Sequence, residues 1–459
     1  MGLADGSADS RSQIGEISHL PIPELSRIAW MASSNIDSGR NETRPIYRLP
    51  PEALALIIDF CQLEQFEGHP SGAYRWVRLM LVSRMWRATI LSFPSLWSKL
   101  VLNASISQSE MITLVDRSGS HPLQVAIPRA CSKAYRRSDR HKRIELAIKL
   151  LPRVSRLTIH TCGKHDRPQV PRMFKGRTAD QLLELNLRTP FVEEFVLYAP
   201  RLRSLTLPRT ESWPPPPSEN ITHICLFSSL NPESLERGLK NCPRLKEIRI
   251  DLVSYLVELP GDHPKISLLP GVRLIITGSV NTMASLFALG PTNYLSITTT
   301  FGGYGILDTP YLGFALPRDI SRLGNLDDLT MVHLKLTDTG DGGLRRTFTL
   351  TLKCSTADRE ALHVQVDNIL AYEDSHPDPT DMEGVPTRAM GYLYPLDLRQ
   401  VVELRMDGFI EGWVIHSSEL SYFLEKMPTL RRITTGDDNA GMFSLALGTM
   451  EHNVVIERV

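Results

Sequence analysis

A short repeated motif constrains the fold of this chain more than any other feature of its sequence. A proline and an arginine precede an apolar-x-x-apolar-x-apolar run at Pro152–Ile159, Pro200–Leu207 and Pro243–Ile250, and a partial copy spans Pro428–Thr435. A chain of this composition would contain roughly 0.3 full copies by chance. Each run predicts a short strand that buries alternate side chains, and no single unit can bury its apolar face alone. We therefore expect a leucine-rich-repeat-like α/β solenoid over residues 99–459, with a curved array of short parallel strands over residues 180–330.

The segment in front of the repeats has the periodicity of helices. Pro50 and Pro51 precede apolar positions 53, 54, 56, 57, 58 and 60, which predicts a helix that begins just after the prolines. A polar break follows at residues 64–72, and apolar residues then recur every three to four positions over residues 74–90, which predicts a second helix. We expect a small helical module over residues 44–98. Residues 1–43, rich in Ser, Asp and Gly, are expected to be a disordered tail.

Composition excludes several classes of partner. The 51 basic and 51 acidic residues balance, so bulk charge does not indicate nucleic acid or an anionic membrane surface. No apolar stretch approaches the length of a membrane span. The six cysteines contain no CxxC pair, which is typical of reduced thiols in a cytoplasmic or nuclear protein without a zinc site. We expect no nucleic acid, membrane, metal or cofactor partner.

Catalytic motifs are weak throughout the chain. The triplet Asp338-Thr339-Gly340 matches an aspartic protease, but that chemistry needs a second copy, and the sequence has none. His160, Cys162 and His165 lack a fourth metal ligand. A hydrolase in the C-terminal half would have Asp338, Asp341 and His363 as its only candidate residues. We expect that the chain is not an enzyme.

Residues 47–98 resemble an F-box, in the F-box-like form found in mushroom-forming fungi. The resemblance rests on the opening Leu49–Leu54 (LPPEAL), the segment Leu81–Arg87 (LVSRMWR) and Pro94–Trp97 (PSLW). It extends more weakly, through Leu114–Leu123 and the Pro-Arg units, to about residue 250. An insertion, Gln62–Ala73, departs from the family pattern. The resemblance implies docking on a Skp-type adaptor that joins a cullin-RING ubiquitin ligase core.

The same resemblance nominates adaptor-contacting or supporting residues, and the interface should be mainly apolar. They are Leu49, Pro50, Leu54, Ile57, Leu79, Val82, Trp86 and Trp97.

The second expected site lies on the strands. Arg203, Lys246 and Arg249 occupy polar positions of the repeats, where a row of cations would favour an acidic or phosphorylated segment of a target protein. We therefore expect a substrate-recognition subunit of an SCF-type ubiquitin ligase, with a target that the sequence does not identify. The alternative is a leucine-rich-repeat scaffold without a ligase, whose helical module serves only as an N-terminal cap.

Overall fold

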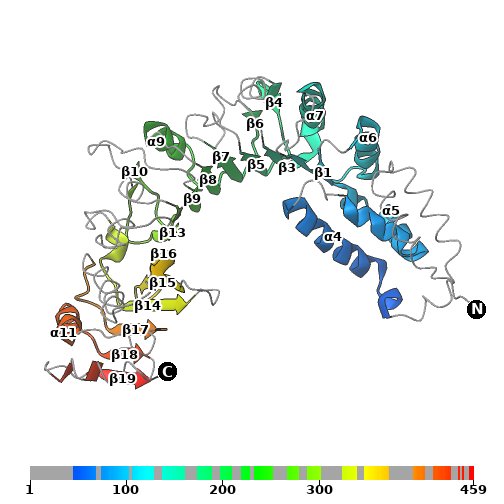
Figure 1. The fold of residues 1–459 in the computed structure, drawn as a ribbon. Helices are drawn as coiled ribbons and strands as arrows, with labels where there is room; N and C mark the ends of the chain where they lie inside the picture. Colours follow the sequence, from blue (N-terminus) through cyan, green and yellow to red (C-terminus); the bar gives the residue numbers. More distant parts are fainter. Residues whose placement is uncertain are drawn as a thin grey trace, which may run out of the picture. The chain divides into compact units, whose positions relative to one another are not determined.

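The structure is a computed structural model of the 459-residue chain. It describes residues 45–68, 74–102, 106–128, 137–160, 173–188, 197–208, 219–227, 232–251, 266–278, 287–300, 323–338, 346–371, 396–408, 417–435, 443–444, 447–448 and 454–458. The expected disordered tail, residues 1–43, lies outside the described residues. The chain divides into two compact units, Met1–Leu202 and Arg203–Val459, each of which combines helices with a mostly parallel sheet (Figure 1).

The first unit begins with helices, as the periodicity predicts. Helix α4 begins at Pro51, the second of the two prolines, and continues to Gly68. The predicted break at residues 64–72 therefore begins too early. Glutamine, leucine and glutamate, all good helix formers, occupy most of positions 62–67 and explain the extension. The helical elements before the first strand are η1 (Pro45–Arg48), α4 (Pro51–Gly68), η3 (Arg75–Leu81), α5 (Arg84–Ser92) and η4 (Pro94–Trp97).

The single helix predicted over residues 74–90 is wrong, because the structure contains two short helices there, η3 and α5. Ser83 separates them. Its extended backbone ends the first helix, and its side-chain oxygen accepts the backbone N–H of Trp86 at 3.3 Å. A serine that caps a helix in this way satisfies a donor that the first turn would otherwise leave unpaired.

A parallel sheet follows within the same unit. Strands β1, β2, β3 and β5 pair in that order, and all three pairings are parallel. Val154, Leu157 and Ile159, the apolar positions of the first repeat, are fully buried on β3. The strands and helices are β1 (Lys99–Val101), α6 (Gln108–Arg117), β2 (Leu123–Ile127), α7 (Arg137–Leu150), η5 (Leu151–Arg153), β3 (Val154–Ile159), β4 (Arg177–Thr178), β5 (Glu184–Leu187) and β6 (Leu197–Tyr198), of which β4 and β6 form a separate two-stranded parallel sheet.

The second unit opens with five strands in sequence order, β7–β8–β9–β11–β13, each parallel to the next. Leu205 and Leu207 on β7 and Ile248 and Ile250 on β9 are fully buried, as the repeat predicts. The expected parallel pairing is thus confirmed for these strands. The elements are β7 (Ser204–Leu207), β8 (His223–Phe227), α9 (Pro232–Lys240), β9 (Glu247–Asp251), β10 (Ile266–Ser267), β11 (Arg273–Thr277), β12 (Phe287–Ala288) and β13 (Tyr294–Thr300), with β10 and β12 paired outside the main sheet.

The next three strands break this order. β14, β15 and β16 form an antiparallel meander, and β16, not β14, lies beside β13. β14 at the far side of the meander pairs in parallel with β17, after which β18 and β19 continue the parallel series. The sequence did not predict this meander. The elements are η10 (Gly324–Leu326), β14 (Met331–Asp338), β15 (Arg346–Ser355), β16 (Glu360–Ala371), β17 (Glu403–Asp407), α11 (Ser417–Glu425), β18 (Arg432–Thr435) and β19 (Val455–Arg458).

Candidate functional sites

Helix α4 is apolar on two faces, and the described residues cover only one of them. Leu54 and Ile58, four residues apart, are 0% exposed. Leu56 and Phe60, also four residues apart, are 71% and 73% exposed, and Ile57 between them is 41% exposed. Residues at this spacing project from one face of a helix. Because large apolar side chains gathered on one exposed face commonly mark a contact surface, we call Leu56, Ile57 and Phe60 the α4 patch.

The residues nominated by the family resemblance differ in their exposure. Pro50, Ile57 and Val82 are exposed, and Leu49 and Leu79 are half-buried. Leu54, Trp86 and Trp97 are buried, so these three would support a partner surface from the core. Sequence reasoning missed Leu56 and Phe60. A second row of apolar residues, offset from Leu54 and Ile58, was the signal that could have identified them.

Trp97, in the PSLW segment, lies at the centre of the helical core. Its indole N–H donates to the carbonyl oxygen of Ile90 at 2.8 Å, and its ring lies edge-on to Trp76 with centroids 5.0 Å apart. The Arg117 guanidinium lies 4.5 Å from the centroid of the same ring. Burial, followed by the charge of Arg87, lowers the pKa of Arg117. Substituting Trp97 would therefore disturb the core of the module as well as any bound partner.

Three contacts join the helical module to strand β1 and its approach. The Lys99 ammonium lies 2.7 Å from the Asp59 carboxylate on α4. The Tyr74 hydroxyl accepts the backbone N–H of Val101 at 2.8 Å, and burial raises the pKa of this hydroxyl. The Gln62 side-chain amide donates to the carbonyl oxygen of Leu96 at 2.7 Å. The two contacts from α4, through Asp59 and Gln62, leave the α4 patch exposed.

The three nominated target-binding cations do not form one row. Arg249 lies on the polar face of β9, where its guanidinium contacts the Asp251 carboxylate at 3.0 Å. Arg203 and Lys246 are exposed and immediately precede β7 and β9. The Thr222 N–H donates to the Arg203 carbonyl oxygen, and the Lys246 N–H donates to the Thr222 carbonyl oxygen. Arg203 and Lys246 therefore lie at the same end of the sheet, one strand apart on either side of Thr222. The expected cationic surface therefore consists of Arg203 and Lys246, which are exposed where β7 and β9 begin, and Arg249, which is ion-paired on the polar face of the sheet.

The candidates for catalysis and metal binding are not assembled among the described residues. Asp341, Cys162 and His165 lie outside those residues, as does the side chain of Asp338. His363 contacts Glu360 at 3.3 Å on β16. In the described ranges, no group of at least three His, Cys, Asp or Glu side chains is arranged to hold a metal ion. Within the same ranges, no helix combines the length and the apolar character needed to span a bilayer.

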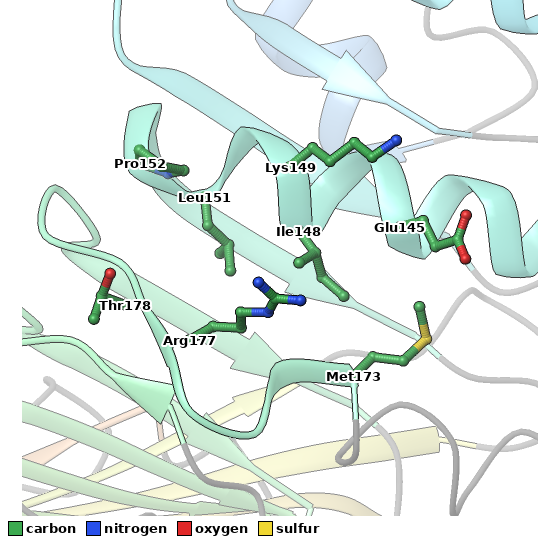
Figure 2. A pocket seen from close by; sticks show the side chains of 8 residues that line it. All are labelled: Glu145, Ile148, Lys149, Leu151, Pro152, Met173, Arg177 and Thr178. Carbon is green, nitrogen blue, oxygen red and sulfur yellow. The ribbon is translucent and has the colours of Figure 1, made fainter.

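A pocket of about 730 Å³ lies in the first unit, between the end of α7 with η5 and the segment that leads into β4 (Figure 2). Its lining mixes apolar groups with two cations and one carboxylate. This lining lacks the paired acid and base groups of a hydrolytic site. The lining residues are Glu145, Ile148, Lys149, Leu151, Pro152, Met173, Arg177 and Thr178.

Comparison with protein-family models, with curated proteins and with solved structures gave no match to this chain. The functional argument therefore rests on the surfaces described above.

Proposed function

We propose that this chain is a non-catalytic substrate-recognition subunit of an SCF-type cullin-RING ubiquitin ligase, acting in the cytoplasm or nucleus. The α4 patch carries the proposal. Fully burying a large aliphatic or aromatic side chain contributes about 1.5–3 kcal/mol, so Leu56 and Phe60 offer a partner several kcal/mol that the chain itself leaves unused. In an F-box, the helix that follows the leucine-proline opening belongs to the adaptor-docking module. The patch lies on the corresponding helix of this chain.

We also propose that the parallel strands belong to a leucine-rich-repeat-like solenoid that holds the target protein. The support is the repeated unit, in which buried apolar positions alternate with polar positions on each strand. Arg203, Lys246 and Arg249 would contribute to target capture. Simultaneous adaptor and target binding would raise the effective concentration of the target at the ligase, without chemistry in this chain.

The test of adaptor docking is a double substitution in the α4 patch, Leu56→Asp with Phe60→Asp, compared with Ile112→Asp. Ile112 is 49% exposed on α6 of the same unit, so it controls for the addition of a charge to an exposed apolar helix position. Recovery of a purified Skp-type adaptor on the immobilised chain should be lost with the double variant and kept with the control. Equal recovery from both variants would remove the patch from the interface.

A second variant tests the opening motif without adding charge. Removing a central anchor of an interface commonly costs at least about 2 kcal/mol, roughly thirtyfold in affinity. Leu49→Ala with Pro50→Ala should therefore abolish adaptor recovery. The helical circular dichroism and the thermal midpoint should stay close to those of the wild type, because Pro50 is exposed and Leu49 only half-buried.

One observation favours the scaffold as a second candidate function. Lys99–Asp59 and the Tyr74–Val101 bonds join the helices to β1, as an N-terminal cap of a repeat array would require. The two functions differ in whether an adaptor binds. If the wild-type chain recovers no Skp-type adaptor while other F-box proteins do under the same conditions, the scaffold function replaces the ligase function.

A further inference from the structure

A row of five polar side chains, four of them nitrogen-bearing, crosses the polar face of the meander and its two neighbouring strands. Pairing registers place Ser296 of β13 opposite His363 of β16, His363 opposite Lys353 of β15, Lys353 opposite His333 of β14, and His333 opposite Arg405 of β17. Directly opposite residues project from the same face of a sheet. All five side chains are partly exposed, so the row is accessible from solvent.

Two carboxylates of this face contact the residues on either side of Lys353 and leave Lys353 itself without a carboxylate partner among the described residues. Asp407 accepts from His333 at 2.8 Å and from Arg405 at 3.2 Å, and Glu360 lies 3.3 Å from His363. The central residue, Lys353, has no ion pair among the described residues.

Two other cations on the sheet face of this unit are paired. Arg249 lies 3.0 Å from Asp251, and Arg432 lies 3.3 Å from Glu457. Lys353 has no such partner among the described residues, so it adds no ion-pair energy to the stability of the sheet.

We propose that Lys353, with His363 and His333 on the adjacent strands, binds the phosphate group of a phosphorylated segment of a partner protein. Neighbouring strands lie about 4.8 Å apart, so side chains from three consecutive strands can converge on one small anion. A phosphate ester has three terminal oxygens and a charge near −2 at neutral pH, which matches three donors. Lys335, two residues after His333 on the same face of β14, is exposed and adds a cation that has no ion pair among the described residues.

A phosphate suits this site better than a carboxylate from the partner. Glu360 and Asp407 already place carboxylates at the rim of the row. A carboxylate from the partner would offer one charge and two oxygens to the three donors, whereas a phosphate ester offers about twice the charge and three terminal oxygens. Charge-assisted hydrogen bonds from lysine and protonated histidine to phosphate are also stronger than neutral ones.

Binding at this site should depend on pH. The charged or titratable groups around His363 are Glu360 on its own strand, Lys353 on β15 and Tyr294 on β13, which donates to Glu360 at 3.2 Å. Those around His333 are Lys353 on β15 and Asp407 and Arg405 on β17. Burial and, more weakly, Lys353 lower the pKa of His363. A bound dianion would favour protonation of the imidazole, so affinity should rise as pH falls from 8 to 6.5.

This inference rests on the target-binding part of the proposed function and does not require adaptor binding. The probe is a fluorescein-labelled peptide pool with a fixed central phosphoserine between degenerate positions. Matched pools carry serine or glutamate at the fixed position, and anisotropy measures their binding to the full chain. The phosphoserine pool should bind most tightly. Lys353→Gln should weaken its binding at least about tenfold, the effect of losing one charge-assisted contact, and Lys353→Arg should restore most of it.

The matched control is Arg432→Gln, which removes a cation from the same sheet face at a position that is already ion-paired. It should bind the phosphoserine pool like the wild type. Equal binding of the phosphoserine and glutamate pools, equal binding by the wild type and Lys353→Gln, or no binding of any pool would each overturn the proposal. Adaptor recovery is measured on the same samples. Its loss with intact phosphopeptide binding would contradict the ligase function and leave this inference standing.

Discussion

Consecutive strands pair in parallel in the region β7–β13 and antiparallel in the meander β14–β16, although both regions belong to one unit. In the first region consecutive strands are parallel, which requires each connection to return the chain to the same end of the sheet. In the second, β15 reaches β16 through a short turn in which the Thr356 N–H donates to the Arg359 carbonyl oxygen at 2.9 Å. A short turn can join only antiparallel strands. The connection, more than the apolar content of the strands, decides the pairing.

The difference also shows how the meander enters the array without ending it. Outside the main sheet, Leu289 still bridges Leu323 in parallel, and the Gly324 N–H donates to the Leu289 carbonyl oxygen at 3.0 Å. The chain segment that leads into β14 therefore lies beside the segment that leads into β13. In the main sheet, however, β16 and β15 lie between β13 and β14. The two extra strands widen the polar face at the row centred on Lys353.

The largest expected effect tests the register of the parallel region. Ile276 on β11 is fully buried, whereas its neighbour Ile275 lies half-buried on the polar face. Ile276→Ala should lower the free energy of unfolding by about 2–5 kcal/mol, because it leaves a cavity in the core. Ile275→Ala, the matched control, should cost less than about 1 kcal/mol. Urea denaturation measures both, and the reverse order would mean that the strand has slipped by one residue.

A smaller difference should separate two buried asparagines that occupy corresponding turns. Before β13, Asn293 donates to the carbonyl oxygens of Leu269 and Val272 at 2.7 and 3.2 Å, and its side-chain oxygen accepts the Gly290 N–H at 2.7 Å. Before β14, Asn325 donates to the Ala361 carbonyl oxygen at 2.9 Å, and its side-chain oxygen has no partner among the described residues.

Leaving buried partners unsatisfied costs about 1–3 kcal/mol each. Asn293→Ala should therefore destabilise the chain by about 3 kcal/mol or more, and Asn325→Ala by about 1–2 kcal/mol. Thermal unfolding of both variants gives the comparison. If both cost the same, the bonds that differ between the two turns contribute nothing to stability.

The pH dependence of stability should distinguish the meander from the parallel region. The pKa of His363 is lowered by burial first, so the unfolded chain binds its proton before the folded chain does. Stability is therefore retained above the ordinary histidine value of about 6.5 and declines as pH falls below it. Between pH 7.5 and 5.5, His363→Gln should lose less thermal stability than the wild type. His223→Gln on β8, where the histidine is exposed, serves as the control and should follow the wild type.

The smallest expected effects concern surface charge. Arg249→Gln breaks the exposed contact with Asp251 and should cost no more than about 1 kcal/mol, an effect that 1 M NaCl should largely remove. Lys353→Gln has no ion pair to lose among the described residues and should change stability by less than about 0.5 kcal/mol. Denaturant unfolding at low and high salt checks both. A loss above 1 kcal/mol for Lys353→Gln would indicate a structural role for this lysine.

Local sequence patterns predicted much of the fold but little of the row on the meander. The Pro-Arg units located strands β3, β7 and β9, the partial copy located β18, and the two prolines located the beginning of α4. The nitrogen-bearing row was missed because His333, Lys353 and His363 come from three strands and share no local motif. The α4 patch was missed in part because the sequence pattern of a helix does not distinguish an apolar residue that the chain itself buries from one that a partner would bury.

The sequence by itself determined which side chains each short strand buries, because alternation along a strand depends only on residue order and on the period of the pleat. It also determined where α4 begins, because a proline locks its own backbone. Only the tertiary structure decided that β16 and not β14 lies beside β13, and that Lys353 has a histidine on either side. Strand order depends on competition between distant edges for backbone hydrogen bonds, and no short stretch of sequence encodes the outcome of that competition.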